Sequence, residues 1–150
     1  MIRVQREDFD MKAAYDLLHQ GRTGVGGVCT FVGLVRDLAG GEGVSAMTLE
    51  HYDGMTQRQL EKIEAEARER WPLEEVVLIH RYGRLEPGDQ IVFVGTASAH
   101  REAAFESCHF LIDWLKTKAP FWKLEEKDTG ADWVEAQASD DAAADRWEKA

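Results

Sequence analysis

Residues 75–98 of this 150-residue chain have the sequence EVVLIHRYGRLEPGDQIVFVGTAS, in which two apolar runs are separated by a turn-rich connector. The runs Glu75–Tyr82 and Gln90–Ser98 are rich in valine, isoleucine and phenylalanine, and the connector Gly83–Gly88 contains two glycines and a proline. Runs of this composition joined by glycine and proline are typical of a β-hairpin. The stretch therefore predicts two adjacent antiparallel strands of one sheet.

Helical patterns lie on both sides of this hairpin. Before it, apolar residues recur every three or four positions in a helix that is predicted to run from its N-cap, Asp53, to Trp71, where Pro72 stops it. After it, a helix is predicted over residues 101–119, and Pro120 ends it. The hairpin is thus expected to lie between two helices.

The N-terminal part of the chain is predicted to begin with a strand, Ile2–Val4, and a helix over residues 11–19 with Asp10 as its N-cap. Residues 25–35, VGGVCTFVGLV, are apolar on both faces, which predicts a strand in the middle of a buried sheet. The glycine-rich residues 37–43, DLAGGEG, predict a flexible loop.

The remaining strands are predicted over residues 44–52, 121–127 and 132–137, and the last two are expected to pair across a turn at Thr129 and Gly130. Antiparallel hairpins therefore alternate with helices along the chain. This order favours an α+β fold over a doubly wound parallel sheet.

Length and charge narrow the class of protein. A chain of 150 residues is expected to form one domain, residues 1–150, and its net charge of −10 argues against a nucleic-acid-binding surface. Much of the acid lies toward the C-terminus, where residues 138–150 predict a short acidic helical tail. No apolar run approaches the roughly 18 residues of a membrane span, and the start lacks a secretion signal, which predicts a cytoplasmic protein without a membrane partner.

Several kinds of cofactor chemistry lack a motif in this chain. Cys29 and Cys108 stand alone, and the five histidines show no tight ligand spacing, so neither a metal nor a redox cofactor is expected. GxxxxGK[ST], GxGxxG, HExxH and GxSxG are all absent. Cofactor-free chemistry on an anionic substrate remains, with lysines and arginines as the working groups.

Lys116 is an anomaly within the predicted third helix. At 100° per residue it falls in an apolar stripe that contains Phe105, Cys108 and Ile112, whereas Lys118 points away from that stripe. One interpretation is a packed stem whose ammonium reaches water. The other is a lysine in a cleft wall that acts as a base or nucleophile.

Two further groups of residues are candidates for anion binding. His100 and Arg101 begin the same helix, where free N–H groups and the helix dipole favour a phosphate or carboxylate; the alternative is that Arg101 pairs with Glu102. Arg36 closes the glycine-rich strand beside the 37–43 loop, either as a surface residue or as a clamp on a ligand.

The segment Lys116–Lys127, KTKAPFWKLEEK, contains four lysines and two large aromatic residues in an otherwise acidic chain. If it is extended from residue 121 onward, Lys123 and Glu125 share one face and each influences the protonation of the other. This pattern indicates an anion pocket, although an ion pair on an edge strand explains it as well.

Five segments of the chain, in their order, resemble the family of large, catalytic subunits of molybdopterin synthase. They cover nearly the whole chain, together with a Trp133-Val134 pair, and are FVGLVRD (31–37), LEHYDGM (49–55), IHRYGRLEPGD (79–89), SAHREAAFESC (98–108) and LKTKAPFWKLE (115–125). The resemblance implies an α+β fold with an α/β hammerhead and an additional small antiparallel β subdomain.

The resemblance also implies an activity and partners. Members of this family are sulfurtransferases of molybdenum cofactor biosynthesis that convert cyclic pyranopterin monophosphate to molybdopterin. A small ubiquitin-like sulfur-carrier subunit supplies each sulfur from a C-terminal Gly-Gly thiocarboxylate. Two copies of each subunit form a heterotetramer around a homodimer of the large subunit, which implies that the second copy contributes groups to each pocket.

Site residues follow from the resemblance by position. Lys116 and Lys123 match the family's catalytic lysines. The substrate-binding residues that it implies include both of these lysines and also Leu34, Val35, Arg36, His100, Arg101, Leu124 and Glu125. Gln137 stands where relatives carry arginine.

Two functions from other classes compete with this reading. A non-catalytic dimeric module would use the same basic pocket to bind a phosphorylated small molecule or an acidic peptide tail, without turnover. An enzyme of phosphoryl or acyl transfer would use Lys116 as a covalent nucleophile.

Overall fold

The computed structural model describes residues 1–39, 42–52, 54–118, 121–127, 130–134, 143 and 145–148, and it describes only the backbone of residues 38–39, 42–45, 122, 124–127 and 130–134. The helices are α1 (Met11–His19), α2 (Met55–Arg70) and α3 (Arg101–Thr117). The strands are β1 (Ile2–Gln5), β2 (Gly27–Leu34), β3 (Leu38–Ala39), β4 (Glu42–His51), β5 (Leu73–Arg81), β6 (Gly83–Leu85), β7 (Gln90–Ser98), β8 (Phe121–Lys127) and β9 (Gly130–Val134). The predicted α+β class is confirmed.

The first sheet is built around the predicted hairpin. Its strand order is β1-β5-β7-β2, with β5 and β7 antiparallel and with Leu78 opposite Val94. β1 lies parallel to β5 on one side, and β2 pairs with β7 on the other. The two predicted strands are therefore the centre of this sheet.

The position predicted for residues 25–35, in the middle of the sheet, is wrong. β2 lies at the edge, and the side chains of Phe31 and Leu34 are 38% and 53% exposed. A run that is apolar on both faces indicates that both faces are covered, but it does not specify how many strands flank it.

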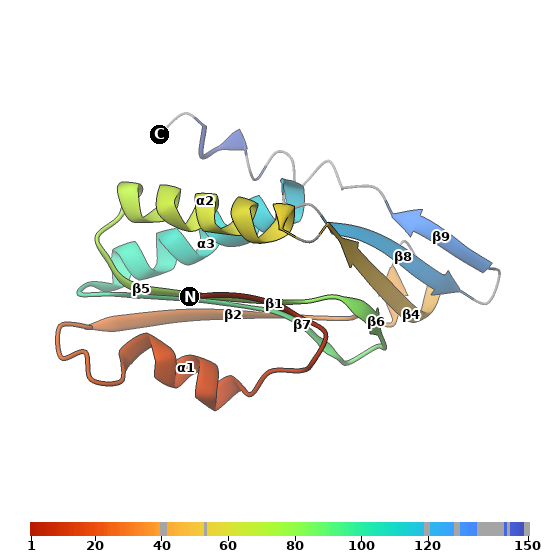
Figure 1. The fold of residues 1–150 in the computed structure, drawn as a ribbon, viewed down its shortest axis with the longest axis horizontal. Helices are drawn as coiled ribbons and strands as arrows, with labels where there is room; N and C mark the ends of the chain where they lie inside the picture. Colours follow the sequence, from red (N-terminus) through yellow and green to blue (C-terminus); the bar gives the residue numbers. More distant parts are fainter. Residues whose placement is uncertain are drawn as a thin grey trace.

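Helices cover both faces of this sheet. Figure 1 shows α1 on one face and α2 with α3 on the other. Asp10 caps α1 as predicted, because its Oδ1 accepts a hydrogen bond from the Ala13 N–H at 2.8 Å. A Cβ atom at Gly95 of β7 would lie 2.5 Å from Cδ1 of Leu18, so the absence of a side chain there lets α1 approach the sheet.

The helix predicted from Asp53 begins at Met55, after Gly54, and Asp53 lies outside the described residues. Gly54 occupies the N-cap position with φ of +77°, a conformation that glycine adopts without steric cost. Trp71 is the C-cap, directly before Pro72, as expected for a helix that a proline stops.

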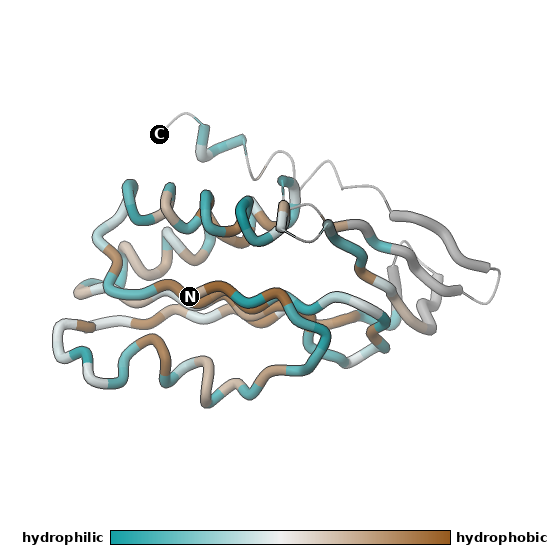
Figure 2. Tube along the Cα trace, in the orientation of Figure 1, coloured by the Kyte–Doolittle hydropathy of each residue, from teal (hydrophilic) through white to brown (hydrophobic). Residues whose placement is uncertain are grey.

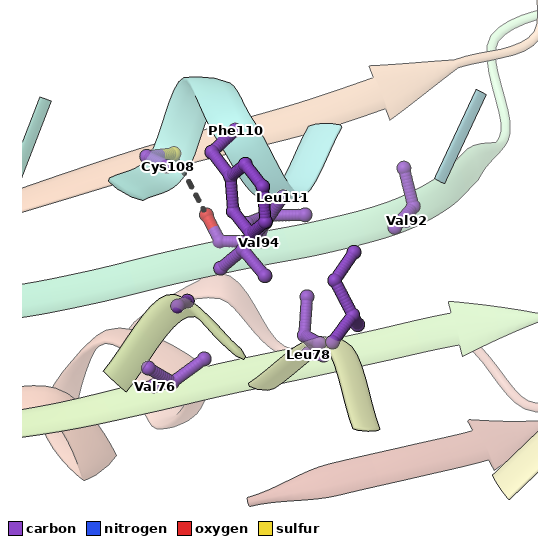
Figure 3. Packing of buried hydrophobic residues seen from close by; sticks show 9 residues of the cluster. Val76, Leu78, Val92, Val94, Cys108, Phe110 and Leu111 are labelled. Carbon is purple, nitrogen blue, oxygen red and sulfur yellow. Dashed lines mark hydrogen bonds between the residues drawn. The ribbon is translucent and has the colours of Figure 1, made fainter. Parts of the chain in front are cut away.

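The main core lies between the first sheet and the pair α2 and α3. Figure 2 shows apolar residues concentrated on the strands that the helices cover. The buried cluster, most of which is labelled in Figure 3, consists of Ile63, Ala67, Val76, Leu78, Val92, Val94, Cys108, Phe110 and Leu111. The Cys108 thiol donates to the Val94 carbonyl at 3.8 Å, and burial raises its pKa, so this cysteine behaves as a core residue.

The second sheet extends from one end of the first (Figure 1). Its order is β3-β4-β8-β9, and β6 also pairs with β4. β8 and β9 form the predicted hairpin, with β9 over residues 130–134 instead of 132–137. Residues 135–142 lie outside the described residues, as do 144, 149 and 150 of the predicted acidic tail.

The loop that was predicted over residues 37–43 is partly a hairpin. Leu38 pairs with Gly43 and Ala39 pairs with Glu42, while residues 40 and 41 lie outside the described part of the chain. The prediction was wrong for the paired residues because glycine-rich composition marks a turn but does not define its length. In the described residues, no helix has the length and apolarity that crossing a membrane requires.

Candidate functional site

Lys116 and Lys123 both lie near His80, at the end of the first sheet where the second sheet begins. Lys116 lies in the last turn of α3, and Lys123 lies on β8, opposite Leu49 of β4. Both ammonium groups act on one imidazole, that of His80 on β5. Burial, together with the nearby Lys116, Lys123 and His51, lowers the pKa of His80 to about 4. Elements from both sheets thus converge on this cluster.

Aromatic rings pack around His80. The His80 side chain is buried, and its ring stacks on Phe121 with centroids 3.8 Å apart and an interplanar angle of 14°. His51 approaches Phe121 at 6.0 Å and Tyr82 at 4.3 Å. Phe121 is therefore flanked by a histidine from each of two sheets, His80 of β5 and His51 of β4.

Hydrogen bonds determine the tautomers of both histidines. Nδ1 of His80 lies 2.8 Å from the Arg81 carbonyl, which only accepts, so this nitrogen carries the proton. Nδ1 of His51 lies 3.1 Å from Oγ1 of Thr56, whose hydroxyl donates to the Tyr52 carbonyl at 2.9 Å. The Thr56 oxygen therefore accepts from His51, and in the neutral His80 ring Nε2 is the remaining acceptor.

The apolar stripe predicted for the third helix is partly confirmed, because Cys108 is buried and Ile112 packs against the core, but Phe105 and Lys116 do not belong to the packed face. Phe105 is 64% exposed and Lys116 is exposed as well. The buried side of α3 instead consists mainly of small and apolar residues, Ala103, Ala104, Ser107, Cys108, Phe110 and Leu111. Small side chains let the helix lie close to β7, where Oγ1 of Thr96 donates to the Ala104 carbonyl at 2.7 Å. Lys116 is thus on the rim of the packed face.

Lys118 differs from Lys116 in its surroundings, as predicted. Its Nζ lies 3.4 Å from Oε1 of Glu148 and 5.7 Å from the centroid of the Trp114 ring. The side chain is exposed and contacts the C-terminal residues. It therefore serves as a reference for an ordinary surface lysine.

Leu34, Val35 and Arg36 lie at the same end of the molecule as Lys123. An open depression of about 550 Å³ is lined by Val35, Arg36, Asp37, Pro87 and Gly88. Val35 is buried in one cluster with Leu49, the residue opposite Lys123. The exposed Arg36 side chain thus borders a hollow that is large enough for a small ligand.

His100 and Arg101 lie at the opposite end of α3. His100 is the N-cap and Arg101 is the first helical residue, and both are exposed. Fifteen residues separate Arg101 from Lys116, which corresponds to about 22 Å along the helix at the usual rise per residue. A single chain therefore does not assemble all the predicted site residues in one pocket.

Leu124 and Glu125 are described only as backbone, in register with Thr48 and Met47 of β4, and Gln137 lies outside the described residues. Sequence reasoning included Phe121 in the segment predicted to form an anion pocket, but it missed His80 and His51 as parts of the cluster. The available signal was a histidine directly after the apolar run VVLI in a central strand. In the described part of the chain, no group of His, Cys, Asp or Glu has the geometry to hold a metal ion.

His80 makes folding stability depend on pH. The unfolded histidine titrates near 6.5 and the folded one has a pKa of about 4, so at pH 5.5 the unfolded chain binds a proton that the folded chain does not. Stability is therefore lost as the pH falls through 6.5. We expect lowering the pH from 7.5 to 5.5 to reduce the unfolding free energy by about 1 kcal/mol through this residue.

Urea denaturation of the wild type and of His80→Phe at both pH values measures this contribution. Both values lie above the isoelectric point of about 4.9. The variant is expected to show the smaller pH dependence, by about 1 kcal/mol. An equal dependence in the two proteins would contradict the assignment of a neutral, buried imidazole.

Comparisons with known proteins agree with the resemblance in sequence. A family described as "MoaE protein" matches residues 4–118. A molybdopterin synthase catalytic subunit of Pseudomonas aeruginosa is 55% identical over 148 residues, which cover 99% of each chain. The MoaE protein structure from Burkholderia ambifaria has a TM-score of 0.85 at 51% identity and covers 99% of this chain and 97% of the other. Molybdopterin synthase from Staphylococcus aureus has a TM-score of 0.83 at 26% identity, covering 89% and 96%.

Proposed function

Because the chain belongs to the MoaE family of molybdopterin synthase catalytic subunits, we propose that it transfers sulfur to cyclic pyranopterin monophosphate and forms the dithiolene of molybdopterin. The donor is the C-terminal Gly-Gly thiocarboxylate of a small ubiquitin-like partner subunit. The reaction takes place in the cytoplasm, and the chain needs no metal or cofactor of its own for it.

The observation that carries this proposal is that Lys116, in the last turn of α3, and Lys123, on β8 opposite Leu49, both lie near the buried His80. The thiocarboxylate sulfur attacks a side-chain carbon of the substrate and displaces an oxygen from it, so negative charge develops on the departing oxygen. Water then cleaves the acyl–sulfur bond, which leaves the sulfur on the substrate and a carboxylate on the partner. Two ammonium groups beside the reacting atoms stabilise the charge and transfer protons. Both lysines are therefore proposed as catalytic residues that also bind the substrate.

The substrate phosphate and pterin are assigned to the remaining predicted residues. Arg36 borders the open depression, next to Leu34 and Val35, and offers a planar guanidinium for a phosphate. Leu124 and Glu125 follow Lys123 directly on β8, and we assign them to the wall of the same pocket.

His100 and Arg101 are assigned to the pocket of a second copy. Their distance of about 22 Å from Lys116 along α3 is too long for one small substrate to bridge within a chain. In a symmetric dimer the same residues reach the partner's pocket, and the partner's residues reach this one. We therefore propose a homodimer at the centre of a heterotetramer with two small subunits.

The decisive assay mixes the protein with the thiocarboxylated small subunit and cyclic pyranopterin monophosphate. Dithiolene product and the loss of sulfur from the partner's mass are followed together. Product formation with a matching loss of sulfur is expected. Tight binding of the partner without product would overturn the enzymatic function and would favour a binding module.

Replacing Arg36 with alanine is expected to raise the KM for the cyclic pyranopterin by about 10- to 100-fold and to change kcat little, because a charge-assisted hydrogen bond to phosphate is lost in ground and transition state alike. Steady-state kinetics with varied precursor measures this effect. Arg3→Ala is the matched control, since Arg3 is an exposed arginine on β1. A fall in kcat at unchanged KM would contradict the binding role.

A further inference from the structure

The contact between His80 and Phe121 joins the two sheets beside the catalytic lysines. His80 belongs to β5 in the first sheet, and Phe121 is the first residue of β8 in the second. Their rings are nearly parallel, with centroids 3.8 Å apart. An offset or parallel stack of this kind fixes both the distance and the orientation of the two elements that carry it.

Lys116 and Lys123 belong to different layers of the molecule. Lys116 is part of α3, which packs on the first sheet, whereas Lys123 is part of β8 in the second (Figure 1). Their relative position therefore depends on contacts between the layers. Phe121 and Lys123 are two residues apart on one strand, so their side chains leave the same face about 7 Å apart.

We propose that the stack of His80 on Phe121 is a positioning element that sets the place of Lys123 relative to Lys116 for sulfur transfer. This inference rests on the proposed function, because it assigns a role in that reaction to two residues that do not themselves react. Neither ring needs to touch the substrate. Their task is to hold the start of β8 against β5.

His51 supports the same strand from the other side. It lies opposite Phe121 in the β4–β8 ladder, and its ring is 6.0 Å from that of Phe121. The hydrogen bond from Nδ1 of His51 to Thr56 ties it to the start of α2, where Thr56 is buried. Phe121 thus contacts β4 and β5 before the chain reaches Lys123, and the β4 contact is in turn tied to α2.

The electrostatics of the site agree with a packing role for His80. The groups that face it are Lys116 from α3, Lys123 from β8 and His51 from β4, and burial already disfavours the charged imidazole. A third positive charge beside two lysines would repel them. A neutral ring therefore suits the packing role of residue 80. Phenylalanine in place of His80 would keep the flat surface that stacks on Phe121.

Four variants test the proposal: His80→Leu, Phe121→Leu, the double variant, and His80→Phe as the conservative rescue. Leucine fills similar space but has no flat ring. Each leucine variant is expected to lower kcat by about 10- to 100-fold, since a displacement of about 1 Å has an effect of that size. The KM values for the precursor and for the small subunit should stay within about twofold.

The double variant is expected to lose no more activity than either single variant, because both changes break the same contact. His80→Phe should recover most of kcat. Leu18→Val, which removes volume from the core under α1 on the far face of the sheet, controls for a general loss of stability. Multiplicative losses in the double variant, or no rescue by phenylalanine, would overturn the positioning role.

A second readout does not depend on turnover. The rates at which an amine-acetylating reagent modifies Lys116, Lys123 and Lys118 are measured by mass spectrometry in each variant, with Lys118 as the internal reference. His80→Leu is expected to change the rates of Lys116 and Lys123 relative to Lys118, and His80→Phe is expected to restore them. If the rate ratios are the same in the wild type and in His80→Leu, the inference is overturned. If the ratios change as expected but the wild type makes no product, only the proposed function is overturned.

Discussion

Replacing Lys116 with alanine is expected to lower kcat at least about 100-fold while the protein stays folded. The ammonium group is proposed to stabilise charge and transfer a proton at the reacting atoms, and alanine supplies neither. Because Lys116 is exposed on the rim of the packed side of α3, its removal should change the unfolding free energy by no more than about 0.5 kcal/mol. Single-turnover rates of product formation, together with thermal unfolding, measure the two effects separately.

Lys118→Ala is the matched control, since it removes the same charge two residues further on, where the side chain contacts Glu148. We expect wild-type kcat for this variant. Lys123→Ala should lose as much activity as Lys116→Ala, and the double variant should lose little more, because groups that act together are not additive. Normal turnover by both single lysine variants would remove the catalytic assignment.

A mixed dimer of two defective subunits is expected to recover about half of the wild-type rate. One subunit carries Lys116→Ala and the other carries His100→Ala with Arg101→Ala. If each pocket combines Lys116 of one copy with Arg101 of the other, one of the two pockets in the mixed dimer has both intact sets. Each homodimer of a defective subunit has none.

Two affinity tags allow the mixed dimer to be purified after co-expression, and its rate at limiting precursor is compared with those of both parent homodimers. The expected gain follows from the separation of about 22 Å between Arg101 and Lys116 along α3. A mixed dimer that is no more active than its parents would mean that each pocket is built from a single chain. A dimer that carries all three changes in one subunit and none in the other is the control, and it should have no intact pocket.

Local elements were predictable because their signals are local. The β5–β7 hairpin follows from two apolar runs and a turn, and the cap of α1 follows from one aspartate before a helical pattern. The edge position of β2 was not predictable, because apolar residues on both faces of a strand indicate that both faces are covered but do not indicate how many strands pair with it. The hairpin within residues 37–43 was missed for a related reason, since a glycine-rich composition does not show which residues pair with one another.

The candidate site shows the same division. The excess of lysine around residues 116–127 indicated an anion pocket, and the motif order indicated the family, which the comparisons confirm. The helical period identified Cys108 and Ile112 as packed residues, but it wrongly included Phe105 and Lys116, which are exposed, and it missed Ala103 and Ala104, which are buried. Apolar character alone does not distinguish a core residue from an exposed one when small residues let a helix lie closer to the sheet.

The sequence by itself determined the class of fold, the three helices and the long strands, the family and the basic residues available for chemistry, but it missed the short strands β3 and β6, the second of which lies in the predicted connector. Only the tertiary structure decided which distant residues lie near one another: Lys116 and Lys123 both lie near His80, about 22 Å along α3 from Arg101. The physical reason is that periodicity and capping depend on neighbours within a few residues. Contacts such as His80 on Phe121 depend instead on how whole layers pack, and no local pattern encodes that.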